Sequence, residues 1–198
     1  MVSNARDDPI AVVSGLPRSG TSMMMQMIEA GGMPVLMDTA RAADEDNPRG
    51  YYEYEPVKRL EADGSWLYEA QGKAVKVVSE LLRYLPVTHD YRVVFMDRRM
   101  AEILASQRAM LARRETGQEA DVDDAQMAAI YRKHLSQVWA WIEARPNVVA
   151  LRVDYGEVVA SPGVWASKIA QFLSAGLDPH AMAKVVDASL HRQARDTG

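Results

Sequence analysis

Short apolar, β-branched runs alternate along the chain with longer segments of helical periodicity. The runs that predict strands are residues 11–14, 33–37, 74–78, 92–96 and 147–153. The periodic segments that predict helices are residues 21–30, 56–69 with an interruption at Gly64, 101–113, 124–144, 162–174 and 178–190. Strands that alternate with helices are typical of a parallel sheet covered by helices. We therefore expect an α/β fold with a central, mostly parallel sheet in a single three-layer domain over residues 1–198, in which the acidic segment 115–124 is a mobile loop.

Composition narrows the classes of partner. The chain has 198 residues, no cysteine and a formal net charge of −4, so it has no overall basic field for a nucleic acid polymer. Without cysteine it forms no disulfides and no thiolate metal sites, which is compatible with a reducing compartment. No apolar run approaches the roughly 20 residues of a membrane span. We expect a cytoplasmic protein without a membrane span, in which any anion site is local.

The stretch SGLPRSGTS at residues 14–22 joins the first strand to the first helix. A glycine-containing turn at a helix N-terminus directs several backbone N–H groups to one point and binds tetrahedral anions. Thr21 and Ser22 can add hydroxyl donors, and Arg18 can add a permanent charge. A nucleotide hydrolase would place lysine where Thr21 stands. The alternative is an ordinary turn in which Ser19 or Thr21 caps the helix.

The segment GLPRSGTS resembles the 5′-phosphosulfate loop of sulfotransferases, which carries lysine or arginine between a proline and Ser-Gly-Thr. The resemblance implies a P-loop nucleotide-hydrolase-like fold and 3′-phosphoadenosine 5′-phosphosulfate (PAPS) as the sulfuryl donor, with no metal required. It also implies that Arg18 contacts the sulfuryl group. The residues implied around the 5′-phosphate are Pro17, Arg18, Ser19, Gly20, Thr21 and Ser22.

A second segment, RVVFMDRRMAEILASQ, resembles the 3′-phosphate motif of the same family, in which a serine follows a strand-end arginine by eight positions. Arg98 and Ser106 have this spacing. An arginine at a strand end and a hydroxyl two turns along the next helix can converge on one phosphate. The family usually continues Arg-X-Pro, whereas this chain has Met100 at the third position. For Arg98 alone, a surface charge at a strand end is the alternative.

Two further segments, NPRGYYEYEPV and LRVDYGEVVASPGVWASKIAQFL, also resemble parts of bacterial sulfotransferases, so the resemblance covers most of the chain. The Arg-Lys-Gly clamp that some members place over the nucleotide is missing. Arg192 and Arg195, in SLHRQAR, are candidate replacements, and a polar chain end is the alternative.

The resemblance implies in-line transfer of a sulfuryl group to a hydroxyl or amine, which needs stabilisation of charge on the bridging oxygen. Arg18 is the first candidate for this role and Lys76 the second, although Lys76 can also be an exposed strand-end lysine. Some members carry a histidine two positions after that lysine, where this chain has Val78.

The resemblance then implies, as the family's alternative, that a carboxylate from the segment after the loop is the general base, and the candidates are Glu53, Glu45 and Asp46. Glu53 ranks first because its tyrosine neighbours could line a pocket around it. A solvated carboxylate is the alternative for each of them. His134, near the apolar face of the long helix, is expected to form a structural hydrogen bond.

The methionine run at residues 23–27 is expected to pack in the core, with a role in an acceptor pocket as the alternative. The acceptor itself is open among small molecules, lipids and glycans, and the oligomeric state is open too. Two other functions are compatible with the loop. One is a small-molecule kinase that uses Mg-ATP, which the missing lysine disfavours. The other is a catalytically inactive member of the family that only binds a nucleotide.

Overall fold

Five parallel strands form the central sheet of the computed structural model, which describes residues 8–38, 50–113, 123–173 and 176–186. In chain order they are β1 (Ile10–Gly15), β2 (Val35–Leu36), β3 (Ala74–Lys76), β4 (Tyr91–Asp97) and β5 (Val148–Asp154). Their order across the sheet is β2-β3-β1-β4-β5, and each neighbouring pair is parallel. The α/β fold expected from the sequence is confirmed, and the sheet is wholly parallel within the described residues.

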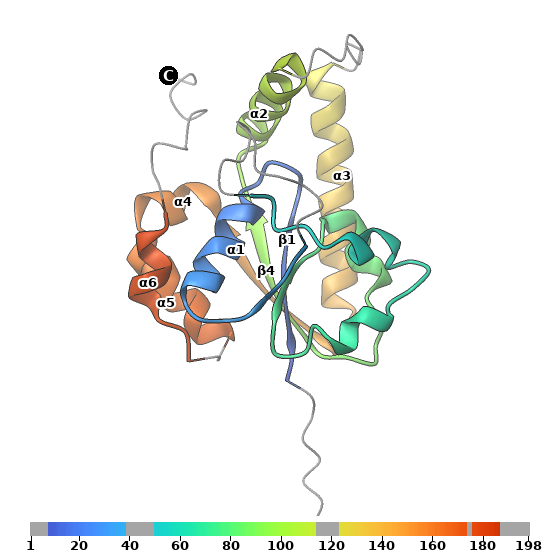
Figure 1. The fold of residues 1–198 in the computed structure, drawn as a ribbon. Helices are drawn as coiled ribbons and strands as arrows, with labels where there is room; N and C mark the ends of the chain where they lie inside the picture. Colours follow the sequence, from blue (N-terminus) through green and yellow to red (C-terminus); the bar gives the residue numbers. More distant parts are fainter. Residues whose placement is uncertain (1–7, 39–49, 114–122, 174–175, 187–198) are drawn as a thin grey trace, which may run out of the picture.

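Helices cover both faces of this sheet (Figure 1). One layer contains α1 (Thr21–Ala30), α4 (Tyr155–Ala160), α5 (Pro162–Leu173) and α6 (Pro179–Lys184). The other contains α3 (Asp124–Glu143) and the 3-10 helices η1 (Glu55–Arg59), η2 (Ser65–Tyr68) and η3 (Ser79–Tyr84). Helix α2 (Met100–Arg113) projects beyond the sheet. The domain therefore has the three layers that the alternating pattern predicts.

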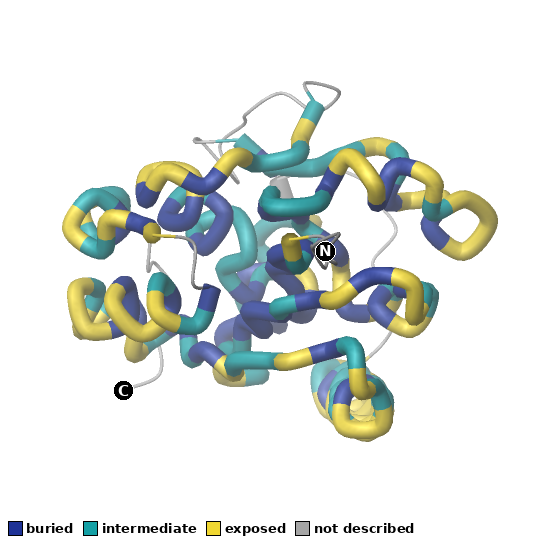
Figure 2. The backbone as a smooth tube through the Cα atoms, turned by 90° about the horizontal axis from the view of Figure 1, so that it is seen from below, coloured by how far each residue is buried: buried dark blue, intermediate teal, exposed yellow. Residues whose placement is uncertain are grey.

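The central strand β1 is buried on both sides, and its side chains alternate between two hydrophobic cores. Ala11 and Val13 belong to the core under α1 and α5, whereas Ile10 and Val12 belong to the core under α3 and the 3-10 helices. Buried residues accordingly lie mostly in the middle of the molecule, and exposed residues lie mostly at its periphery (Figure 2).

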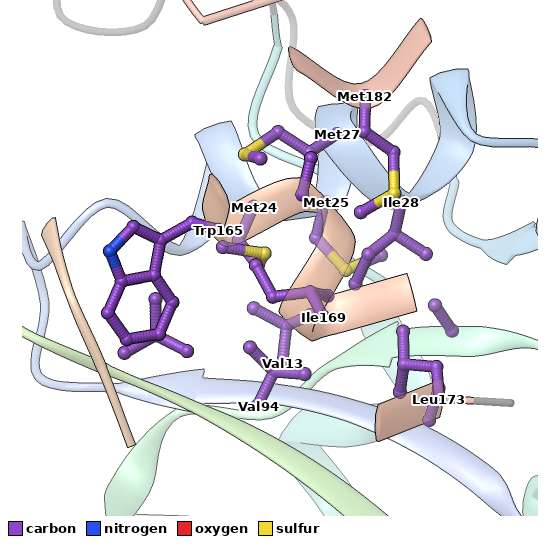
Figure 3. Close-up of a cluster of buried hydrophobic side chains, with 14 of the residues drawn as sticks. Val13, Met24, Met25, Met27, Ile28, Val94, Trp165, Ile169, Leu173 and Met182 are labelled. Atoms are coloured by element: carbon purple, nitrogen blue, oxygen red, sulfur yellow. The ribbon is translucent and has the colours of Figure 1, made fainter. Parts of the chain in front are cut away.

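The methionines of α1 fill the first of these cores. Met24, Met25 and Met27 have no exposed surface, and they pack with Met182 of α6 between α1, α5 and the sheet (Figure 3). Unbranched thioether side chains fill irregular gaps of this kind. The expectation that the methionine run packs in the core is confirmed.

Several elements differ from the sequence prediction. The helix expected over residues 56–69 is two 3-10 helices, because Asp63 Oδ1 accepts a hydrogen bond from the Ser65 N–H (2.9 Å) and forms a local turn before the second. The last helix, capped by Asp178 as expected, ends at Lys184 rather than at residue 190. Of the predicted loop 115–124, residues 115–122 lie outside the described part of the chain and Asp124 already belongs to α3.

Helix α4 is an element that the hydrophobic pattern does not predict. Asp154 caps it by accepting a hydrogen bond from the Glu157 N–H (2.9 Å). Asp-x-x-Glu at residues 154–157 is a capping-box pattern that signals this helix start. Among the described residues, none of the helices combines the length and the apolar character needed to cross a membrane.

Candidate functional site

The carboxyl ends of β1 and β4 lie side by side at the centre of the sheet, where Gly15 is in register with Met96. Helix α1, which follows β1, packs on one face, whereas α3, which follows β4 and α2, packs on the other. Parallel α/β sheets bind ligands beyond the strand ends where consecutive connections leave in opposite directions. The two segments singled out in the sequence therefore meet at the position where this architecture forms sites.

The loop after β1 has an unusual backbone. Gly15 has φ 149°, Gly20 has φ 98° and Arg18, which carries a side chain, has φ 70°. A long side chain in the left-handed region is uncommon and costs free energy. The N-cap of α1 is Gly20, without a side-chain capping bond, so the alternative in which Ser19 or Thr21 caps the helix is wrong. The first N–H groups of α1 thus have no cap from the loop's side chains and are suited to an anion.

Close packing holds the loop in this shape. A Cβ atom added at Gly15 would lie 2.5 Å from Ser19 Oγ, and one added at Gly20 would lie 2.4 Å from Cδ2 of Tyr155. Ser19 is fully buried, and its backbone N–H donates a hydrogen bond to the Leu16 carbonyl (3.2 Å). Its hydroxyl oxygen has no hydrogen-bond partner among the described residues. Ser19 is therefore packed inside the turn and is not among the residues that line the cavity described below.

Arg98, at the end of β4, is held on three sides. Its side chain is only 8% exposed, and its Nε donates to Oε2 of Glu102 (2.8 Å). One terminal nitrogen donates to the backbone carbonyl of Arg18 (3.0 Å), and the guanidinium carbon lies 4.4 Å from the centroid of the Tyr155 ring. The interpretation of Arg98 as a surface charge is therefore wrong.

A direct hydrogen bond joins the loop to α2. Arg18 Nε donates to the Ser106 hydroxyl, with 2.9 Å between the two atoms. This bond links residues that are 88 positions apart in the sequence, and the contact from Arg98 to the Arg18 carbonyl links residues that are 80 positions apart. The two predicted phosphate-binding motifs thus form one continuous structure.

A cavity of about 420 Å³ opens beside this junction. Its polar lining includes Arg18, Thr21, Glu53 and Lys76, which are four of the predicted site residues. The rest of its lining is mostly apolar or aromatic: Leu16, Pro17, Tyr51, Tyr54, Val57, Val78, Leu81, Met110 and Tyr131, with Gly15, Lys58 and Gln107. Glu53 and Lys76 therefore border the same space as Arg18, although they come from different segments.

The segment around Tyr51 connects the cavity wall to the loop. Lys76 Nζ donates a hydrogen bond to the Tyr51 carbonyl, and Ser22 Oγ donates to the same oxygen (3.3 Å). Tyr52 points elsewhere: its hydroxyl donates to Glu29, and burial together with this carboxylate raises the pKa of Tyr52 well above its usual range. Two of the three tyrosines, Tyr51 and Tyr54, thus line the cavity as expected.

Gln107 and Tyr131 are site residues that the sequence did not single out. The Tyr131 hydroxyl donates to Oε1 of Gln107 (3.0 Å), so α3 and α2 meet across the cavity. The position of Gln107 directly after Ser106 was the one signal in the sequence for its place at the site. Nothing in the sequence indicates that Gln107 contacts Tyr131.

Four predicted site residues, Glu45, Asp46, Arg192 and Arg195, lie outside the described part of the chain.

His134 lies in a second cavity, of about 300 Å³, whose lining includes none of the predicted donor-site residues. Its Nε2 is hydrogen-bonded to the Ser79 hydroxyl (2.8 Å), so the expected structural bond is confirmed. Across the described ranges, no group of three or more His, Asp or Glu side chains is placed to hold a metal ion.

Fold and site together define an α/β protein with a glycine-containing turn between β1 and α1 at the centre of a parallel sheet. Mouse sulfotransferase SULT7A1, in its crystal structure with PAP, aligns with 98% of this chain and 68% of its own, at a TM-score of 0.53 and 20% identity. The sulfotransferase domain from the curacin biosynthetic pathway aligns with 98% of this chain and 93% of its own, at a TM-score of 0.53 and 14% identity. No protein-family model and no curated protein matches the sequence. The chain has the sulfotransferase fold, as its motifs predict.

Proposed function

We propose that the protein is a sulfotransferase, which transfers the sulfuryl group of PAPS to a hydroxyl or amine of an acceptor. The observation that carries the proposal is the junction of the loop with α2, where Arg18 bonds Ser106 (2.9 Å) and Arg98 bonds the Arg18 carbonyl (3.0 Å). PAPS carries anionic groups on both its 5′ and 3′ oxygens, so its protein needs two linked anion sites. The similarity of the fold to SULT7A1, whose structure holds PAP (3′-phosphoadenosine 5′-phosphate), supports PAPS as the donor.

Each half of this junction would bind one end of the donor. The N–H groups of the turn and the first helical residues, with the hydroxyls of Thr21 and Ser22, would hold the 5′-phosphate. Arg98 and Ser106 would hold the 3′-phosphate through charge-assisted hydrogen bonds. Pro17, Ser19 and Gly20 would shape the turn, and Arg192 is proposed to replace the missing clamp.

In the transfer step the acceptor oxygen forms a bond to sulfur while the bond from sulfur to the 5′-phosphate oxygen breaks. The electron pair of the broken bond stays on that oxygen, where Arg18 and Lys76 would stabilise the developing charge. The Glu53 carboxylate, which lines the same cavity, would accept the proton of the acceptor hydroxyl. Glu45 and Asp46 remain alternative bases. The products are a sulfate ester and 3′-phosphoadenosine 5′-phosphate (PAP).

The cavity favours a small-molecule acceptor with an apolar body. Its walls away from the loop include Val57, Leu81 and Met110, whose side chains offer no strong hydrogen bonds to the polar groups of a ligand. Such a molecule would direct its hydroxyl toward Arg18 and Glu53. Because the chain lacks cysteine, a reducing compartment is compatible with it, and we propose the cytoplasm as the location.

Calorimetric titration with PAP in EDTA, beside ATP with and without Mg²⁺, tests the proposed function. We expect metal-independent binding of PAP that is tighter than binding of ATP, and that is weakened by about tenfold or more, but remains measurable, in Arg98→Ala and in Ser106→Ala. Arg132→Ala, at an exposed position on α3, is the control. Binding of ATP that requires Mg²⁺, without binding of PAP, would replace the proposal with a kinase. PAP binding without turnover of any acceptor would indicate an inactive member.

A further inference from the structure

Glu102 is a buried carboxylate next to the proposed 3′-phosphate site. Its side chain is 3% exposed; Oε2 accepts from Arg98 Nε (2.8 Å), and Oε1 accepts from Arg99 Nε (2.6 Å). A buried carboxylate costs several kcal/mol of desolvation unless it is well paired. The guanidinium groups of Arg98 and Arg99 both pair with this one carboxylate. The three side chains together therefore keep a net positive charge, which favours the binding of an anion.

The Glu102 contact also restricts how Arg98 can move. Glu102 binds the Nε edge of the guanidinium, the Arg18 carbonyl binds one terminal nitrogen, and the Tyr155 ring lies 4.4 Å from the guanidinium carbon. A guanidinium held this way presents its remaining N–H groups in one direction. A pre-oriented side chain loses less conformational entropy when it binds a ligand.

The positions of Glu102 and Ser106 on α2 agree with this arrangement. These two residues are four positions apart on one side of the helix, and Arg98, which precedes the helix, reaches Glu102 with its Nε. Glu102 is therefore a neighbour of both proposed phosphate ligands. Without the pairing to Arg98 and Arg99, its carboxylate would repel a phosphate at this place. Because Glu102 is paired with both arginines, its charge is compensated and its carboxylate holds the Arg98 side chain in place.

We propose that Glu102 is a positioning residue that orients Arg98 and thereby sets the preference of the protein for nucleotides with a 3′-phosphate. The proposal rests on the proposed function, because the 3′-phosphate of the donor is the group that Arg98 would bind. It goes further by assigning part of this selectivity to a side chain that need not touch the nucleotide.

The test compares PAP with 5′-AMP, which lacks the 3′-phosphate, by calorimetry on the full chain. In Glu102→Gln the amide keeps one acceptor oxygen but cannot pair with both arginines as a carboxylate does. We expect PAP to bind about tenfold more weakly, as for the loss of one charged hydrogen bond, while 5′-AMP binds as before. Glu143→Gln, at an exposed carboxylate at the end of α3, is the matched control and should change neither affinity.

A double-mutant cycle with Arg98→Ala separates positioning from direct contact. If Glu102 acts through Arg98, then Glu102→Gln has no further effect on PAP binding in the Arg98→Ala background. Glu102→Asp, which keeps the charge, replaces Glu102→Gln if that variant does not fold. Unchanged PAP affinity in the single variant, an equal loss of PAP and 5′-AMP, or additive effects in the cycle would overturn the inference. Failure of the unaltered protein to bind PAP would instead refute the proposed function.

Discussion

At the scale of single residues, Arg18 combines a strained backbone with two tertiary hydrogen bonds. Its φ of 70° is maintained while its carbonyl accepts from Arg98 and its Nε donates to Ser106. Backbone strain that persists in a well-packed turn is frequent at functional sites. The geometry places a forked cation in the lining of the cavity, where the proposed transfer needs positive charge.

Substitution of Arg18 should therefore strongly lower the rate of the proposed sulfuryl transfer. We expect Arg18→Ala to lower the rate of sulfuryl transfer from PAPS about 100-fold, the usual effect of losing one preorganised donor in a transition state. Arg18→Lys should keep part of the rate, because it keeps the charge without the fork. The measurement is kcat with the first acceptor found to react, with Arg132→Ala as the control. A rate within twofold of the unaltered protein would exclude the role.

Glu53 should act on the acceptor and leave the donor unaffected. In Glu53→Gln the side chain keeps its size but can no longer accept a proton, so we expect kcat to fall by about 100-fold or more. PAP binding, measured by calorimetry, should stay unchanged, because Glu53 comes from a segment outside the two phosphate-binding motifs. An unchanged kcat would transfer the role of base to Glu45 or Asp46.

At the scale of elements, the loop and α4 are fitted to each other. Gly20 has φ 98° and leaves room for Tyr155, the first residue of α4, which in turn lies against Arg98. The turn between β1 and α1 is therefore supported by a helix that lies far from it in the sequence. Short helices placed at a site in this way position side chains that a loop alone would not fix.

Three glycine substitutions separate steric contact from backbone strain. Gly20→Ala meets both the Tyr155 ring (2.4 Å) and a positive φ, whereas Gly32→Ala meets only a positive φ (102°). We expect a loss of unfolding free energy of about 1–2 kcal/mol for Gly32→Ala and a larger loss for Gly20→Ala. Gly163→Ala, in open space within α5, should be neutral or stabilising by up to about 1 kcal/mol. Chemical denaturation measures all three, and equal losses at Gly20 and Gly32 would contradict the described contact.

The elements differ in how far the sequence predicts them. The turn at residues 14–22 is predictable because its glycines, apolar strand and helix are adjacent in the chain. The cavity is not, because Glu53, Lys76 and Tyr131 meet only after β3 pairs beside β1 and α3 packs on the sheet. Helix α4 is missed because its apolar pattern is short, and only the capping box at Asp154 reveals it.

At the scale of the whole molecule, two hydrophobic cores hold the sheet from both sides and fix the distance between the segments of the site. The core around α1 includes Met24, which has no exposed surface, and connects this helix to β1 and to the last helices. Because α1 begins at the loop, packing on this face sets the direction in which the first N–H groups of the helix point.

Loss of core volume under α1 should therefore reduce both stability and donor binding. We expect Met24→Ala to lower the free energy of unfolding by about 2–5 kcal/mol, through lost burial and a remaining cavity. Met37→Ala, at a side chain that is 43% exposed, should change it by less than about 0.5 kcal/mol. Urea denaturation gives both values, and similar small changes would show that α1 is not held by this core.

We propose that the turn at residues 15–20 and the segment from Arg98 to Ser106 form one donor site. A crystal structure of the protein with PAP would show whether they do. We expect the 5′-phosphate at the N-terminus of α1 and the 3′-phosphate within hydrogen-bond distance of Arg98 and Ser106. A nucleotide bound elsewhere, or one whose 3′-phosphate faces solvent while Arg98 keeps its present contacts, would contradict it.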